Sequence, residues 1–185
     1  MSATDIASPP DRSPNSTAEA MRAAFRELHG RRLHGFALLL TLGDRPNAAR
    51  LASVALADGA MRVEELRHPE RAAAWLRRRV VERARVGRGS HVDARVLLDL
   101  GVDEALVVAF GSSGRLERAA LIASAVERLD RRDVASIVGR EGSSLDRLLR
   151  GARVRLMRAY AETAAEPPNG PIAARVQALA RRAMG

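Results

Sequence analysis

The sequence predicts an all-α protein of two small helical domains joined by a linker, the second domain being a helix-turn-helix. Aromatic residues make up only 3% of the 185 residues while hydrophobic residues make up 46%, so Leu, Ala and Val must build the core. These residues suit helices better than sheets. Apolar residues also recur at helical spacing between Gly and Pro breaks. The Gly- and Ser-containing stretches 87–90 and 111–114 separate an N-terminal part from a C-terminal part.

Composition limits the classes of function that the chain can have. The formal net charge is +9, and every cationic side chain is arginine. This balance favours a polyanionic partner, nucleic acid first and an acidic protein second. The absence of cysteine excludes disulfides and thiol catalysis and fits a reducing compartment. No signal peptide is apparent, and the longest apolar run, 36–40, is too short for a bilayer. We therefore expect a cytoplasmic protein without a membrane span.

Residues 1–17 contain two Ser-Pro segments, which predict a flexible tail. The first helical domain is expected at 18–86. Its opening helix has Phe25, Phe36 and several leucines mostly at helical spacing. The sequence Gly43-Asp44-Arg45-Pro46 then predicts a stop and a turn.

Two more helices are expected in this domain, at about 48–61 and 71–85. Pro69 is placed near the N-terminus of the second of these, where proline is favoured. Trp75 and Leu76 should face inward. The arginines of this helix should lie largely outside, and they are Arg77, Arg78, Arg79, Arg83 and Arg85.

Residues 87–114 are expected to form a linker and a connecting helix. Apolar residues return between 92 and 110 and predict either a helix broken at Gly101 or a pair of strands. The glycines at 111–114 do not indicate a phosphate-binding loop, because no Gly-Lys-Ser/Thr sequence follows. This stretch is interpreted as a connector.

The second domain, at 115–162, is predicted to hold the helix-turn-helix. Gly139 follows a short apolar helix and supplies the permissive backbone that a tight turn needs. Ser143 and Ser144 then offer a hydroxyl N-cap to the next helix. That helix carries one apolar stripe, formed by Leu145, Leu148, Leu149, Ala152 and Leu156.

The segment from Arg147 to Arg158 contains five arginines and no acidic residue. Such a helix can bury one face and present cations to phosphates with the other. The predicted DNA-binding residues are Ser143, Ser144, Arg147, Arg150 and Arg153. In the alternative interpretation, Ser144 only caps the helix and the arginines are solvated.

Residues 163–185 are expected to form a Pro-rich break and a last amphipathic helix at about 172–184, which packs back on the domain or docks on a partner. The four histidines show no metal-ligand pattern. No set of residues resembles a catalytic constellation. We therefore expect neither an enzyme nor a cofactor.

The order of these parts resembles the bacterial RNA polymerase sigma factors of the extracytoplasmic-function type. The resemblance covers about residues 20–160. It is carried by AFRELHGRRLHGFALLLTLGDRPNAARL, Ala74-Trp75-Leu76, Arg118-Ala119-Ala120-Leu121, DVASIVG, and the helix from Leu145 to Leu156 with Arg150, Ala152 and Arg153. It implies a region-two-like domain at 18–86 and a region-four-like domain at 115–162. The protein would bind RNA polymerase core and promoter DNA to direct transcription initiation, and the polymerase would supply the chemistry.

The first domain has further candidates for contact with the polymerase or with single-stranded promoter DNA: Arg50, Arg77, Arg78 and Arg79. A charge run on a helix is also typical of a solvated face. Trp75 could stack on a base, although its spacing favours a place in the core.

Several positions depart from the pattern of the family. Where the family has acidic and amide side chains after the turn, this chain has Ala49-Arg50 and Ser53-Val54, and Gly59-Ala60 replaces an expected aromatic residue. In the recognition helix, Asp146 and Leu148 replace a lysine and an arginine that commonly face DNA. An acid at position 146 would repel phosphate.

These departures favour a second hypothesis, a sigma-shaped adaptor or regulator. Such a protein would act through protein–protein contacts with polymerase, an anti-sigma factor or another protein, without reading promoters. A third, simpler hypothesis is a basic helical DNA-binding protein that makes no contact with polymerase.

Overall fold

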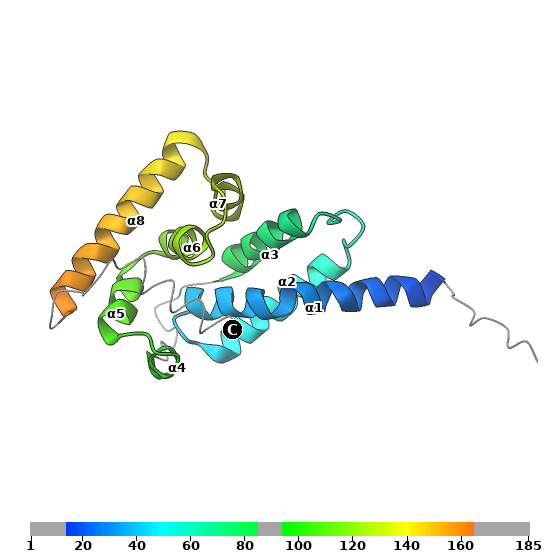
Figure 1. Ribbon diagram of the computed structural model, residues 1–185, viewed down its shortest axis with the longest axis horizontal. Helices are drawn as coiled ribbons and strands as arrows, with labels where there is room; N and C mark the ends of the chain where they lie inside the picture. Colours follow the sequence, from blue (N-terminus) through cyan, green and yellow to red (C-terminus); the bar gives the residue numbers. More distant parts are fainter. Residues whose placement is uncertain (1–13, 85–93, 165–185) are drawn as a thin grey trace, which may run out of the picture.

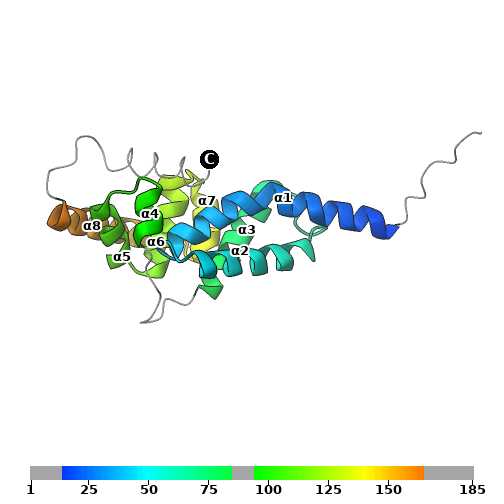
Figure 2. The same cartoon turned by 90° about the horizontal axis from the view of Figure 1, so that it is seen from below.

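The computed structural model describes residues 14–84 and 94–164, which form helices and connecting turns without any β-strand. The predicted all-α fold is confirmed. Figures 1 and 2 show an elongated molecule, with the start of α1 at one end and α8 at the other. Within the described ranges, no helix combines the length and the apolar character needed to cross a membrane. The expected C-terminal helix at 172–184 and most of the expected N-terminal tail lie outside the described residues.

Three helices form the first part of the structure: α1 (Pro14–Leu40), α2 (Arg45–Ala60) and α3 (Pro69–Arg83). Helix α1 begins four residues inside the segment that we expected to be a tail. All three helices pack against one another. Their shared core contains the fully buried side chains Leu33, Phe36, Leu51 and Leu76. Burial of each such side chain stabilises the fold by about 1.5–3 kcal/mol.

The predicted turn between α1 and α2 is present and is built by two consecutive left-handed residues. Leu42 has φ 57° and Gly43 has φ 88°, which reverses the chain direction. The side chain of Asp44 then accepts a hydrogen bond from the Asn47 amide at 3.0 Å and caps α2. This cap satisfies one of the backbone donors that a helix start leaves free.

Gly59 of α2 lies where side chains of α1 and α3 pack tightly against the helix. A Cβ atom at this position would lie 2.9 Å from Leu76 Cδ2 and 2.9 Å from Phe25 Cε1. The side chains of α1 and α3 therefore fill the space that a larger residue would need. This packing gives a physical reason for glycine at this position.

The connecting region between 94 and 112 is helical. It forms α4 (Ala94–Asp99) and α5 (Glu104–Ser112), separated at Gly101, which has φ 79°. Of the two predicted possibilities, the broken helix is correct and the strand pair is wrong. A short connection then leads into α6 (Arg115–Leu121) and a π-helical turn, η1 (Ile122–Val126).

The last two helices are α7 (Arg131–Val138) and α8 (Gly142–Thr163), and they pack on different neighbours. Helix α8 lies on α5 and α6, whereas α7 packs mainly on α3. The Tyr160 hydroxyl donates to Asp103 Oδ2 at 2.8 Å and ties the end of α8 to the start of α5. The expected connecting segment thus supplies part of the surface on which α8 packs.

Candidate nucleic-acid interface

The turn between α7 and α8 contains the left-handed glycine that the sequence predicts, while the two helices pack on different neighbours. Asp130 caps α7 by accepting from the Asp133 amide at 2.8 Å. Gly139 ends α7 in the left-handed region, with φ 64°, and no atom lies within 4 Å of a Cβ built there. Glycine is therefore required for its backbone conformation and not for space.

The start of α8 differs from the prediction. The helix begins at Gly142, so Ser143 and Ser144 lie in its first turn, and Glu141 occupies the N-cap position. The Ser144 hydroxyl donates to the Glu141 carbonyl at 2.6 Å instead of accepting from the backbone. The predicted hydroxyl N-cap is thus wrong. No side chain caps this helix, and the Ser143 amide and hydroxyl lie at an exposed helix N-terminus, where anions are favoured.

The predicted apolar stripe of α8 faces the protein. Leu145, Ala152 and Leu156 are buried, and Leu148 and Leu149 are half-buried against the same core. The stripe fixes which side of α8 faces solvent. Because α8 lies at the edge of the molecule, its other side is free of the described helices (Figure 1).

Arg147, Arg150 and Arg153 are exposed on α8 at three-residue spacing. Within residues 14–84 and 94–164, no carboxylate forms an ion pair with any of these three guanidinium groups. From Ser143 to Arg153 the helix rises by about 15 Å at 1.5 Å per residue. We call Ser143, Arg147, Arg150 and Arg153 the α8 cationic strip.

Asp146 does not leave an uncompensated negative charge beside this strip. Its Oδ1 accepts from Arg131 Nη1 at 2.6 Å, and Arg131 also donates to the Gly142 carbonyl at 3.2 Å. The hydrogen bond from Arg131 lowers the pKa of Asp146, so the pair is fully charged and locally neutral. The acid at this position therefore repels a phosphate less than the sequence alone indicates.

The remaining arginines of α8 have partners. Arg155 donates to Glu117 Oε1 on α6 at 2.8 Å, and Arg158 pairs with Glu162 at 2.9 Å. The Arg158 pair is highly exposed, with 81% and 62% of the side chains accessible. Exposed pairs of this kind contribute little to stability.

Arg77 contradicts the expectation that the arginine run of α3 lies outside. Its side chain is 5% exposed and forms a bidentate pair with Glu127, which follows η1. Its third donor reaches the Ala73 carbonyl at 2.9 Å, and its guanidinium lies over the Phe36 ring. Glu127 is 50 residues away in the sequence, so no local pattern could reveal the pairing. Arg77 holds α3 to the second half of the chain.

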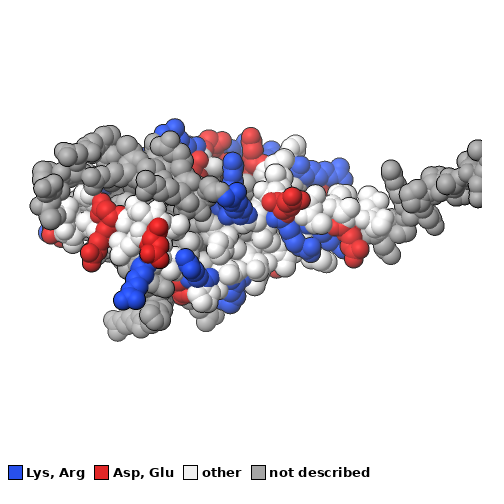
Figure 3. Space-filling model, turned by 60° about the horizontal axis from the view of Figure 1, so that its bottom comes forward, with Lys and Arg blue, Asp and Glu red and all other residues white. Residues whose placement is uncertain are grey.

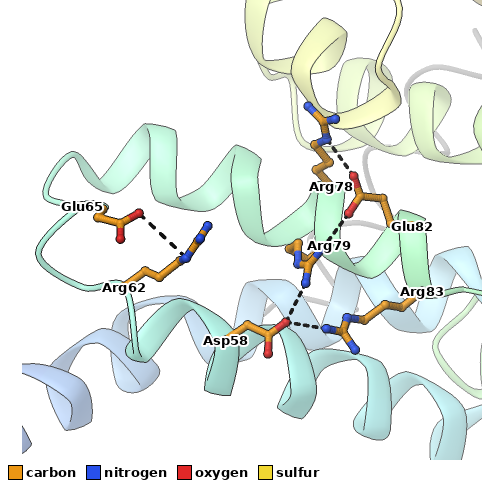
Figure 4. Close-up of polar contacts among 7 residues, drawn as sticks. All are labelled: Asp58, Arg62, Glu65, Arg78, Arg79, Glu82 and Arg83. Atoms are coloured by element: carbon orange, nitrogen blue, oxygen red, sulfur yellow. Dashed lines mark hydrogen bonds and ion pairs between the residues drawn. The ribbon is translucent and has the colours of Figure 1, made fainter.

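The neighbouring arginines of α3 form a partly exposed network with carboxylates (Figure 4). Glu82 accepts from Arg78 at 2.9 Å and from Arg79 at 3.1 Å, and Asp58 on α2 accepts from Arg79 and Arg83. The hydrogen bond that Glu82 accepts from Arg78 lowers the pKa of Glu82, and the hydrogen bonds that Arg79 donates to Asp58 and Glu82 raise the pKa of Arg79. These cations are largely neutralised by neighbours.

Trp75 and Arg50 are the remaining residues of α2 and α3 that were predicted as candidate contacts. Trp75 is half-buried, and the guanidinium groups of Arg62 and Arg79 lie 5.9 and 5.6 Å from its ring centroid. Its ring is thus already in contact with two cations of the protein. Arg50 is exposed and donates to Asn47 Oδ1 at 2.8 Å.

Other surfaces of the molecule carry both positive and negative side chains, unlike the α8 cationic strip. The face in Figure 3 carries basic and acidic side chains scattered among uncharged residues. Among the described residues, no three His, Asp or Glu side chains gather in a way that would hold a metal ion. The α8 cationic strip is therefore the feature that points most directly to a polyanionic ligand.

Comparisons with known proteins provide no further guide: no protein-family model, no curated protein and no solved structure matches the chain.

Proposed function

We propose that the protein is a sigma-factor-like DNA-binding protein that joins RNA polymerase core to promoter DNA. The observation that carries the proposal is the α8 cationic strip, whose arginines are exposed and have no carboxylate partner among the described residues. Unpaired guanidinium groups on an exposed recognition helix are the groups that bind phosphate and read guanine. The first part of the chain, with Arg50 and Arg78 exposed, is proposed to contact polymerase.

Three features support DNA as the ligand of α8. Gly139 ends α7 in the left-handed region directly before α8, the N-terminus of α8 carries no side-chain cap, and Arg131 neutralises Asp146. In helix-turn-helix proteins the N-terminal residues of the second helix contact base edges in the major groove. Ser143, Arg147 and Arg150 occupy the corresponding part of α8.

The test is a pull-down of the tagged protein from its own cells after crosslinking. Mass spectrometry measures the polymerase core subunits, and sequencing measures the DNA fragments recovered with them. We expect core subunits at a reproducible ratio and DNA enriched in a shared sequence. Arg150→Glu should remove the enrichment of that sequence, because it places a carboxylate against phosphate.

Arg26→Glu is the matched control, since Arg26 is exposed on α1 and the charge change is the same. It should leave DNA enrichment unchanged. Equal enrichment by wild type and Arg150→Glu would overturn the assignment of α8 to DNA. Recovery of polymerase core without any enriched DNA sequence would instead favour the sigma-shaped adaptor.

A further inference from the structure

The outer face of α8 carries two large apolar side chains that DNA binding does not explain. Val154 is 68% exposed and Met157 is 50% exposed. They are three residues apart on a helix, so they are neighbours on one face. Ala161 is exposed one turn further along the same face. We call Val154, Met157 and Ala161 the α8 apolar patch.

The patch lies too far along α8 to enter the same groove as the helix N-terminus. At 1.5 Å per residue, Val154 is about 15 Å and Met157 about 20 Å from Ser144 along the axis. The major groove of B-DNA is about 12 Å wide. A helix that inserts its first two turns into the groove therefore leaves this patch outside it.

Charge around the patch is mainly positive. Arg153 and Arg158 are exposed on either side of it, and Arg150 is exposed one turn before Val154. Glu162 is the only acidic residue between Arg147 and Thr163, and its pair with Arg158 is exposed to solvent. The patch is thus apolar with a positive rim.

The apolar surface and positive charge of the patch indicate which partners could bind there. A second copy of α8 would bring Arg153 and Arg158 against their equivalents, which is unfavourable. An acidic amphipathic helix instead offers apolar side chains to Val154 and Met157 and carboxylates to the arginines. Opposite potentials of this kind favour association and fix orientation.

We propose that the second half of α8 is a docking surface for an acidic amphipathic helix of another protein. The α8 apolar patch anchors the apolar face of that helix, and Arg153, which forms no ion pair with a described carboxylate, pairs with one of its carboxylates. Ser143, Arg147 and Arg150 remain free for DNA. Arg153 belongs to both surfaces, whereas Val154 and Met157 belong to this one alone, so variants of these two residues test it separately from the DNA proposal.

The test measures binding of a labelled synthetic peptide to the full-length protein by fluorescence anisotropy. The probe has about 18 residues, five helical turns, with leucines at positions i, i+3 and i+7 and glutamates on the other face. A scrambled peptide and a peptide with lysine in place of glutamate serve as comparisons. We expect the acidic helical probe to bind more tightly than either, with an affinity that falls as salt increases.

The double variant Val154→Ser/Met157→Ser should weaken binding of the probe about tenfold or more, a loss of about 1.4 kcal/mol. Leu28→Ser/Met61→Ser is the matched control, because these side chains are 62% and 75% exposed on other elements. The control should bind the probe like the wild type. Circular dichroism should show the same helix content in all three proteins.

Equal binding of the probe by the Val154/Met157 variant and the wild type would overturn the proposal. So would equal binding of the acidic and the scrambled peptides. Binding to vesicles of phosphatidylserine and phosphatidylcholine that depends on Val154 and Met157, without binding of the probe, would assign the patch to a membrane surface instead. Retention of probe binding by Arg150→Glu would separate this docking surface from the DNA proposal.

Discussion

Helices α3 and α8 both carry several arginines, but the two sets have different surroundings. On α3, Arg77 is buried with Glu127, and Arg78 and Arg79 pair with Glu82. On α8, Arg147 and Arg150 are exposed and form no ion pair with any described carboxylate. Arg77 holds α3 to the second half of the chain, and Arg78 and Arg79 are compensated at the surface, whereas Arg147 and Arg150 of α8 remain available to a ligand.

The difference shows that the ability of a run of basic residues to bind a ligand depends on the acidic residues near it in space. A guanidinium group that is already paired offers little to a phosphate, because its charge is compensated and its donors are in use. An unpaired group keeps both its charge and its donors. Three sets of substitutions test this contrast, beginning with the largest expected effect.

Arg77→Ala should destabilise the protein most strongly, by about 3–5 kcal/mol, because it leaves the carboxylate of Glu127 buried without a partner. Chemical denaturation of the purified protein measures the free energy of unfolding. Both side chains of this pair are 5% exposed, so solvent offers little compensation.

The double variant Arg77→Met/Glu127→Leu is the control for this prediction. Replacing both members of a buried pair by apolar residues of similar size is often neutral or stabilising. We expect its free energy of unfolding to lie within about 1 kcal/mol of the wild type, or above it. If Arg77→Ala alone were as stable as the wild type, the pair would not hold α3 in place.

Arg118 extends the comparison to a buried arginine that pairs with no acidic side chain of residues 14–84 and 94–164. It is 2% exposed, its Nε has no hydrogen-bond partner, and its Nη1 donates to the Phe110 carbonyl at 3.2 Å. Burial lowers its pKa. That carbonyl also accepts from the Ser113 amide, so it would stay satisfied if Arg118 were replaced.

Arg118→Met should therefore stabilise the protein, by about 1 kcal/mol, since it removes a buried charge and keeps an unbranched side chain. Thermal unfolding followed by circular dichroism measures the change in Tm. A lower Tm for Arg118→Met would show that the guanidinium contributes more through its packing and hydrogen bond than its desolvation costs.

The smallest effect on stability is expected on α8. The triple variant Arg147→Gln/Arg150→Gln/Arg153→Gln should change the free energy of unfolding by no more than about 0.5 kcal/mol, as for surface substitutions in general. Its binding to double-stranded DNA should lose about 2.7 units from the slope of log K against log salt, at 0.9 for each phosphate contact. Titrations at several salt concentrations measure this slope. An unchanged slope would mean that the three arginines do not contact phosphate.

Local features of the fold could be predicted from the sequence because their causes are local. The turn at Gly43-Asp44, the left-handed Gly139 and the apolar stripe of α8 each depend on residues a few positions apart. The predicted N-cap role of Ser144 is wrong for a reason that the local sequence hides. A serine near a helix start is a good N-cap in general, but here Gly142 begins the helix earlier and Ser144 bonds to Glu141 instead.

Long-range pairings could not be predicted in the same way. Arg77 is separated from Glu127 by 50 residues, and Tyr160 from Asp103 by 57. Such contacts depend on how helices pack, and a single sequence does not contain that information in any local pattern. For the candidate site, the sequence located the arginines of α8, but only the structure showed that Arg131 neutralises Asp146.

The contact between α3 and α7 has an unusual composition for a surface that joins two halves of a protein. Beside it, the groove walls are formed largely by Ala73, Ala74 and Arg77 of α3, with Leu129 and Asp133 opposite. If the two helices separated, Arg77 and Glu127 would be rehydrated, and part of the apolar side that α7 buries, which contains Val134, Ile137 and Val138, would be uncovered. Water can solvate the separated ion pair but not these apolar side chains, so separation would leave a surface that favours association with other apolar surfaces.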